Sequence, residues 1–521
     1  ITKAIAAVLQ LGVTMDYSIF LYRRYVEECA HHEDKRDAMA AAVEAAFASL
    51  SGSSLTTVAG FVALCFMRLT LGRDIGIVMA KGVVLGVLSV IFVLPSMLLL
   101  FDGKIAKHRH RELIPSMEKL NRHIVQKRGV YVAIFLLLFL PFSVAQNMTE
   151  VYYKLDQSLP RDMASIVAIE KLKDEYDMAS SHFILVRDDL SSQELSAMER
   201  EIQAVDGVTS LVSYHSILGS GIPDFFVPDE VRSMLKTGGW QMMMVNSEYT
   251  TATDEVANQL AELQTIVKSH DESGIITGEA ALTNDLIETS AVDFKTTNYI
   301  SIAAIFLIIA IVFKSLSVPV VLVAAIELAI FINQGIPYFT GTVIPFVSPT
   351  IIGCIQLGAT VDYAILMTTR FQEELRAGKD RKEAAIAAAT SSDSSILTSA
   401  LVLFAATLGV SVASDIEIIG SICSMLARGA LISAAVIILL LPPVLCVCEP
   451  VFHRTSIGWR KPRPVPAEAA ALPETAAPEA PKAAAPQAEK RHPHFGRKSK
   501  ASVPDEQETT EERETVGSGK P

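Results

Sequence analysis

Long apolar stretches alternate with short charged ones along most of the chain. Nine stretches of about twenty residues carry almost no charge, which is the length that a helix needs to cross a bilayer. They are centred on residues 1–20, 54–70, 75–100, 129–145, 298–313, 318–339, 347–369, 396–412 and 418–447. Half of the 521 residues are hydrophobic. The pattern therefore predicts a multi-span α-helical membrane protein.

Basic residues gather in three of the segments between these spans. The segments are 21–53, 102–128 and 370–395. Segments rich in lysine and arginine stay on the cytoplasmic side, and counting spans from any one of the three puts the other two on the same side. Segment 146–297 then lies outside, and the C-terminal tail lies inside.

The outer segment has the pattern of a folded domain. Helical stretches alternate with strand patterns at 181–187, 207–213, 240–246 and 274–278, which predicts a small α/β sandwich. Its charge is strongly acidic, with about 26 acidic residues against about 10 basic ones. An acidic surface repels nucleic acid, so we expect no nucleic-acid partner.

The chain repeats a three-helix unit. LQLGVTMDYSIF (9–20) aligns with IQLGATVDYAIL (355–366), and the match continues through the two following spans. Residues 1–103 and 347–449 are two copies, a duplication of the kind that builds transporter folds. One span, the outer segment and two more spans precede the second copy only. We therefore expect this chain to be the C-terminal portion of a longer protein.

An aspartate followed by a tyrosine lies within the first span of each copy, as Asp16–Tyr17 and Asp362–Tyr363. An ionised carboxylate at the centre of a span costs about 2.5–3.5 kcal/mol. The repeated acids therefore indicate groups that bind and release protons, with each tyrosine bonded to the partner aspartate. A buried polar cluster that only fixes helix packing is the alternative. Gly12 and Gly358, one turn earlier, allow close helix packing and fit both readings.

Five further polar residues are candidates for supporting such a relay. Lys81 and Arg428, at equivalent positions of the two copies, would balance the carboxylates, although snorkelling to the surface fits equally well. Thr57 and Ser399 would extend the hydrogen-bond chain, although bonding to their own helix backbone is favoured. Glu327, inside the span 318–339, is another candidate for protonation.

The motif G-x-x-x-D-Y, present as GVTMDY and GATVDY, resembles the signature of the MMPL branch of the resistance-nodulation-division (RND) superfamily. The likeness covers nearly all of residues 1–450, including FKSLSVPVVLV (313–323) and LARGAL (426–431). It implies an RND-like duplicated bundle with an inserted extracytoplasmic α/β porter-type domain in a bacterial inner membrane. It also implies proton-driven export of lipids or other hydrophobic molecules, with Asp16 paired to Tyr363 and Asp362 to Tyr17.

The resemblance and the span pattern together give an expected organisation. In order, it comprises the last three helices of a first bundle (1–103), a basic cytoplasmic linker (104–128), the first helix of a second bundle (129–145), the porter-like domain (146–297), the remaining five helices (298–450) and a disordered cytoplasmic tail (451–521). The tail is rich in Ala, Pro and Glu and cannot bury a core. Leu113, Ile114, Met117 and Leu120 of the linker predict either a helix on the inner leaflet or a solvated connection.

Several other readings stay open. Within the superfamily, the chain is compatible with a SecD/SecF-like translocation helper or a lipid-sensing relative, and outside it with a non-transporting membrane scaffold. An enzyme is not expected, because the outer segment shows no nucleophile–base set. No metal site and no cofactor are expected. The expected partners are a hydrophobic or lipid substrate, protons and membrane lipids, with homo-oligomerisation left open.

Overall fold

The computed structural model describes residues 2–107, 116–153, 162–218, 232–233, 235–414, 416–457 and 459. The tail expected at 451–521 is helical up to Thr455, and from residue 460 onward it lies outside the described residues. Leu113 and Ile114 of the expected linker face also lie outside them.

Within the described residues, seven helices are long and apolar enough to cross a membrane. They are α3 (Thr70–Phe92), α6 (Arg128–Asn147), α12 (Glu279–Phe313), α13 (Ser317–Thr340), α14 (Ser348–Arg376), α15 (Arg381–Ala413) and α16 (Glu417–Leu439). A pair bent by 43°, Lys35–Phe47 with Leu50–Phe66, makes an eighth. This pair is α2 (Lys35–Ala63) with the short η1 (Leu64–Phe66). The multi-span helical fold is confirmed.

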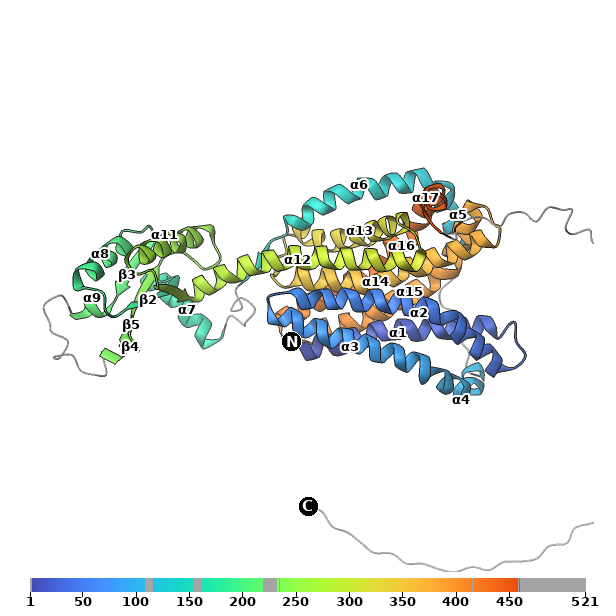
Figure 1. Ribbon diagram of the computed structural model, residues 1–521, viewed down its shortest axis with the longest axis horizontal. Coiled ribbons are helices and arrows are strands. Elements are labelled where there is room, and N and C mark those ends of the chain that lie inside the picture. Colours follow the sequence, from blue (N-terminus) through green and yellow to red (C-terminus); the bar gives the residue numbers. More distant parts are fainter. Residues whose placement is uncertain are drawn as a thin grey trace, which may run out of the picture. The chain divides into compact units, whose positions relative to one another are not determined.

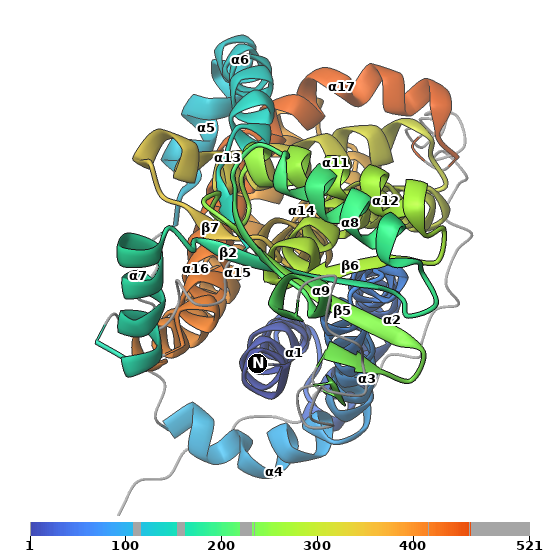
Figure 2. The same ribbon diagram turned by 90° about the vertical axis from the view of Figure 1, so that its left-hand side faces the viewer.

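The remaining expected span, 1–20, is the exception. It corresponds to α1 (Thr2–Glu28), which carries the polar residues Gln10, Asp16 and Arg23 and is not among the apolar helices. It still packs within the bundle against α2, α3 and α15. Figure 2, a view along the bundle, shows α1 between α2 and α3 on one side and α15 and α16 on the other.

The helices extend well beyond their apolar stretches. The expected inner segments 21–53 and 370–395 are mostly helical, since α2 begins at Lys35 and α15 at Arg381. Asp34 caps α2 by accepting from the Arg36 N–H, and Asp380 caps α15 by accepting from the Lys382 N–H. The hydropathy pattern indicates the part of a helix that lies in lipid, whereas the capping aspartates indicate the residue at which the helix begins.

The internal duplication is confirmed by the order and lengths of the helices. The first copy comprises α1, α2, α3 and α4 (Leu94–Lys107), and the second α14, α15, α16 and α17 (Leu441–Thr455). In both copies the third helix breaks before a proline, Pro95 or Pro442, which is the second residue of the next helix. The Gln10 amide donates to the Gly82 carbonyl at 3.4 Å, and Gln356 donates to Gly429 at the same distance.

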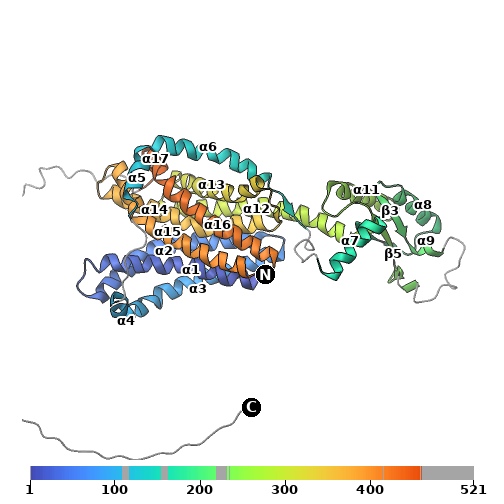
Figure 3. The same ribbon diagram turned by 180° about the vertical axis from the view of Figure 1, so that it is seen from behind.

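Helix α14 forms the centre of the bundle. It packs against α2, α12, α13, α15 and α16, and 89% of its apolar window is buried. Figure 3 shows the opposite face, where α6 runs along α13 and beside α17. Because α14 is surrounded by protein, polar side chains on it are shielded from lipid.

The inner ends of the helices are joined by polar contacts. Tyr25 donates to the Asp102 carboxylate at 3.2 Å, and Lys35 forms an ion pair with the same carboxylate. The short helix α5 (Glu118–Gln126) docks on α15 through Asn121, which donates to Asp393 Oδ2 at 2.6 Å. The three basic segments therefore meet at one end of the bundle.

The expected linker face is only partly correct. Leu120 is exposed, whereas Ile124 and Val125 of α5 are completely buried against the bundle. Helix α5 thus packs on protein, on α15 and α17, with a different apolar set from the expected one. The sequence alone did not reveal α15 and α17 as its partners.

The outer segment folds as an α/β domain, as expected. Its helices are α7 (Ala164–Tyr176), α8 (Ser192–Gln203), α9 (Tyr214–Leu218) and α11 (Asp254–His270). Its strands are β2 (Ser180–Arg187), β3 (Val208–Val212), β4 (Lys236–Thr237), β5 (Trp240–Ser247) and β6 (Ile275–Gly278). The sheet is antiparallel in the order β3-β5-β2-β6, with β4 on β5. Ile184, Met243 and Val245 pack with residues of α8 and α11 in its core.

Helix α12 joins this domain to the bundle. It runs without interruption for 35 residues, so the boundary expected at 297/298 falls inside a helix (Figure 1). The Asp293 carboxylate accepts from the Arg68 and Leu69 N–H groups at 2.9 and 3.0 Å, which ties α12 to the start of α3. A short parallel pairing of β1 (Val151–Tyr152) with β7 (Ile344–Pro345) makes a second connection.

One buried histidine makes the outer domain sensitive to acid. His182 on β2 is completely buried, with its Nε2 3.1 Å from the Gln259 amide oxygen, and burial lowers its pKa. As pH falls below about 6.5, the unfolded chain takes up a proton before the folded one, so the domain loses stability. We expect faster hydrogen exchange in β2 and β6 at pH 5 than at pH 7, after correction for intrinsic rates. His182→Gln should abolish that difference, and an unchanged acid response in the variant would contradict the assignment.

A glycine contact sets how closely the two copies approach. A Cβ on Gly60 of α2 would lie 2.9 Å from Gly358 Cα, whereas a Cβ on Gly358 would meet nothing closer than 3.4 Å. A Cβ on Gly12 would meet only the flexible end of Leu403, at 2.6 Å. Gly60, which the motif did not reveal, is thus the tightest of the three backbone contacts.

We expect Gly60→Ala to destabilise the bundle by about 1–3 kcal/mol, since overpacking forces α2 away from α14. Gly358→Ala and Gly12→Ala are the matched controls and should lose less. Thermal unfolding of the full-length protein in lipid nanodiscs measures all three. Equal losses for Gly60→Ala and Gly358→Ala would show that this contact does not set the spacing.

Candidate functional site

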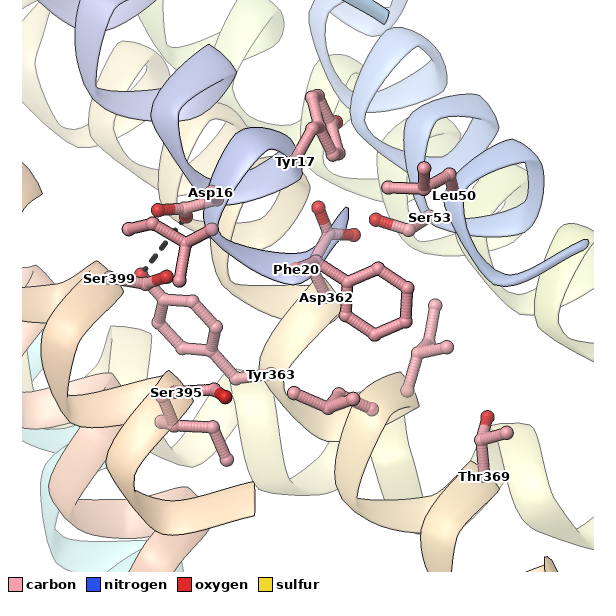
Figure 4. A pocket seen from close by; sticks show the side chains of 14 residues that line it. Asp16, Tyr17, Phe20, Leu50, Ser53, Asp362, Tyr363, Thr369, Ser395 and Ser399 are labelled. Atoms are coloured by element: carbon pink, nitrogen blue, oxygen red, sulfur yellow. Dashed lines mark hydrogen bonds between the residues drawn. The ribbon is translucent and has the colours of Figure 1, made fainter. Parts of the chain in front are cut away.

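A cavity of about 60 Å³ lies where the two copies meet, which is room for a few water molecules. Helices α1, α2, α14 and α15 enclose it. Its lining comprises Asp16, Tyr17, Ile19, Phe20, Leu50, Ser53, Asp362, Tyr363, Ile365, Leu366, Thr369, Ser395, Ile396 and Ser399 (Figure 4). All four residues of the two Asp–Tyr motifs are among them.

Asp16 accepts a hydrogen bond from the second copy. Tyr363 Oη donates to Asp16 Oδ2 at 3.5 Å. The Ser399 side chain lines the cavity beside the same carboxylate (Figure 4). The pair expected from the motif, Asp16 with Tyr363, is therefore brought together.

Asp362 is held by hydroxyl groups of the first copy. Thr57 Oγ1 donates to Asp362 Oδ2 at 3.3 Å, and Tyr17 Oη donates to Thr57 Oγ1 at 3.1 Å. Thr57 Oγ1 also lies 3.0 Å from the Gly358 carbonyl oxygen and 3.1 Å from the carbonyl oxygen of Ser53, which belongs to the same helix as Thr57. The single Thr57 hydrogen serves one acceptor at a time, so Thr57 is a switchable link between Tyr17 and Asp362.

Thr57 and Ser399 lie at matching positions of the two copies. Thr57 of α2 bonds Asp362 on α14, and Ser399 of α15 lines the cavity that contains Asp16 of α1. Ser53 and Ser395 line the cavity one turn away from Thr57 and Ser399. The motif did not reveal these two serines. The polar runs SGSS (51–54) and TSSDSS (390–395), beside apolar spans, were the available signal.

Each aspartate keeps one oxygen without a partner. Asp16 Oδ1 and Asp362 Oδ1 are buried and form no hydrogen bond within the described part of the chain. An acceptor left open at the wall of a water-sized cavity is a place for a proton or a water molecule. Two carboxylates in one low-dielectric cavity repel when both are charged, which favours keeping at least one proton on the pair.

The expected supporting residues divide into two groups. Thr57 bonds Asp362 and Ser399 lines the cavity, whereas the other three do neither. Lys81 is exposed on α3, so it faces away from the carboxylates. Arg428 donates instead to the side chain and carbonyl of Asn333, each at 2.9 Å. Glu327 lines a separate pocket.

A second, smaller cavity of about 30 Å³ adjoins the first on its inner side and shares Phe20, Leu366 and Thr369 with it. Arg24, Arg370 and Glu373 form its charged wall. Arg370 binds both carboxylate oxygens of Glu27 at 3.0 Å and Glu373 at 3.2 Å, which ties α14 to α1. Among the described residues, Arg24 forms ion pairs with Glu27 and Glu28 of its own helix.

Fold and site together define a multi-span α-helical membrane protein with a duplicated bundle, an inserted α/β domain and a central carboxylate pair. The sequence profile of the MMPL family matches residues 1–127 and 157–466. The chain belongs to the MMPL family.

Three relatives illustrate the range of similarity. The membrane protein ActII-3 of Streptomyces coelicolor is 25% identical over 425 residues, which cover 77% of this chain and 55% of ActII-3. The apo-petrobactin exporter of Bacillus anthracis is 22% identical over 487 residues, 85% of this chain and 62% of the exporter. MmpL6 of Mycobacterium tuberculosis, named as a transport protein, is 25% identical over 177 residues, 33% of this chain and 44% of MmpL6. The chain spans 55% and 62% of the length of the first two.

Arg370 lines the inner cavity and is held by its ion pair with Glu27, so breaking that pair should let water reach the cavity. We expect a cysteine placed at Thr369 to react several-fold faster with a membrane-impermeant thiol reagent in inverted vesicles when Arg370→Gln is present. An exposed pair of this kind contributes only about 0–1 kcal/mol, so the protein should still assemble.

The matched control is Lys379→Gln, which breaks the Lys379–Glu374 pair of 2.6 Å outside the cavity. The three cysteines that are not buried, Cys29, Cys65 and Cys448, are replaced by serine in all variants to remove background labelling. Equal reaction rates in the two variants would rule out Arg370 as part of the closure.

Proposed function

We propose that the protein exports hydrophobic molecules, lipids among them, from a bacterial inner membrane, driven by the proton-motive force. One observation carries the proposal: Asp16 and Asp362 share a water-sized cavity between duplicated halves, and each bonds hydroxyls from the opposite copy. Buried membrane carboxylates of this kind mark proton relays.

The hydrogen bonds give each aspartate a charged and a neutral state with different partners. A charged Asp362 accepts from Thr57, which in turn accepts from Tyr17. Once Asp362 is protonated, the Thr57 hydrogen is free to bond the Gly358 carbonyl at 3.0 Å instead. Both acceptors lie on α14, so protonation moves the Thr57 hydrogen bond from one turn of α14 to another and changes the contact between α2 and α14. Release of the proton restores the first arrangement.

The driving force is adequate for such a switch. Moving one charge through 100 mV releases about 2.3 kcal/mol, and a bias of a few kcal/mol changes which conformation of a two-state protein predominates. One or two protons per cycle are therefore sufficient.

A connected path leads from this switch toward the outer domain. Helix α2, which carries Thr57, packs on α12. Asp293 of α12 is bonded to the backbone before α3, and α12 continues from strand β6 of the outer domain. A shift of α2 against α14 is therefore transmitted to the helix that enters the porter-type domain.

The comparisons support the direction and the location. Two of the relatives are named as an exporter and as a transport protein, and all three come from bacteria. The substrate class rests on the likeness to the MMPL family, whose members are associated with hydrophobic cargo. An apolar cargo also suits a protein whose central cavity offers room only for water.

The proposal predicts that Asp16→Asn and Asp362→Asn lower proton-coupled export by at least about tenfold in the full-length protein, because neither amide accepts a proton. Thr57→Val should lower it less, since the Tyr17 link is lost while both acids remain. Export of a hydrophobic fluorescent dye, together with proton influx measured by a pH-sensitive dye, in inverted vesicles provides the readout.

Asp393→Asn is the matched control, because Asp393 is a buried carboxylate on α15 outside the cavity, bonded to Asn121. Its export should stay within about twofold of the parent. Normal export by a correctly assembled Asp362→Asn protein would refute the relay and favour a scaffold.

A further inference from the structure

Glu327 is a buried carboxylate that the aspartate cavity leaves unexplained. It lies near the middle of α13, only 6% of its surface is exposed, and its Oε1 has no hydrogen-bond partner among the described residues. An unpaired carboxylate at this depth is costly and marks a functional site. It needs a neutralising positive charge.

The surroundings of Glu327 supply oxygen atoms rather than a positive charge. Its pocket of about 10 Å³ lies between α6, α12, α13 and α14, and is lined by Gln146, Phe294, Asn298, Glu327, Ile330, Gln334, Pro349, Thr350, Gly353 and Cys354. None of these is a lysine, arginine or histidine. Cys354 is the one other titratable side chain among them.

A second open acceptor faces the same pocket. Gln146 Oε1 is buried without a partner, and the Gln334 amide nitrogen already donates to the Pro349 carbonyl at 2.9 Å. Three amide side chains, those of Gln146, Asn298 and Gln334, therefore line the pocket together with one carboxylate, and the Gln146 oxygen is open. Oxygen ligands of this type suit hard cations, and the space is close to the minimum for one water molecule or one small ion.

We propose that the pocket around Glu327 binds one monovalent hard cation, a proton or Na⁺, at a second site separate from the aspartate cavity. A single carboxylate balances a single positive charge, which is why a divalent ion does not fit. The two sites share no lining residue, and both include α14. Occupancy of the second site stabilises the packing of α6, α12 and α13 around the outer half of α14.

The test is thermal unfolding of the full-length protein in lipid nanodiscs. Na⁺ is varied against choline at constant ionic strength and pH 8, and pH is varied from 8 to 5 without Na⁺. If Na⁺ is the ligand, the unfolding temperature of the parent rises with Na⁺ and saturates. If the ligand is a proton, Na⁺ has no effect and the temperature rises as pH falls.

Comparison with Glu327→Gln isolates the site, because its amide mimics the neutralised state. We expect the variant to lose the response that the parent shows. Asp393→Asn is the matched control for the Na⁺ titration and should keep the Na⁺ response. Gln146→Leu should raise the half-saturating Na⁺ concentration several-fold or, if the ligand is a proton, shift the pH midpoint. This second variant tests the site if Glu327→Gln fails to assemble.

Identical responses of the parent, Glu327→Gln and Gln146→Leu to both Na⁺ and pH would overturn the proposal. The readout is binding rather than transport. Its failure therefore leaves the relay of Asp16 and Asp362 untouched, and failure of the relay leaves this site untouched.

Discussion

The bundle is organised around the need to keep two carboxylates, Asp16 and Asp362, inside an apolar environment. Neither is paired with a lysine or arginine in the cavity that they share. Hydroxyl groups of the opposite copy bond them instead, Tyr363 to Asp16 and Thr57 to Asp362. The packing of α2 on α14 brings Thr57 and Asp362 together. The close approach at Gly60 keeps Thr57 within reach of Asp362.

The duplicated halves are equivalent in sequence but not in their contacts. Tyr363 bonds Asp16 directly, whereas Tyr17 reaches Asp362 through Thr57. On the inner side, Arg370 crosses from α14 to Glu27, while Arg24 stays on its own helix. The two copies therefore differ in their hydrogen bonds and ion pairs, although the order and lengths of their helices match.

Much of the fold and part of the site could be predicted from the sequence. The spans could be predicted because a helix in lipid needs a long run of apolar residues. The repeat could be predicted because the two copies align in sequence. The partner of Asp16 could be predicted because the Asp–Tyr motif occurs twice.

The position of Thr57 between Tyr17 and Asp362 could not be predicted, because it depends on the distance between α2 and α14, which no local sequence pattern encodes. The place of Arg428 could not be predicted either, because its hydrogen bonds go to Asn333, which is far away in sequence. Helix α1 was judged apolar although its own polar site residues lower its hydropathy.

The central claim is that Asp16 and Asp362 take up and release protons as one interacting pair. Infrared difference spectroscopy of the full-length protein tests it most directly, by following the carboxylic acid C=O band during a pH titration and assigning it with single aspartate-to-asparagine variants. The account predicts two linked protonation steps in the parent, and a single step at a different pH when either acid is replaced. Two acids that titrate independently, each unchanged by loss of the other, would contradict it.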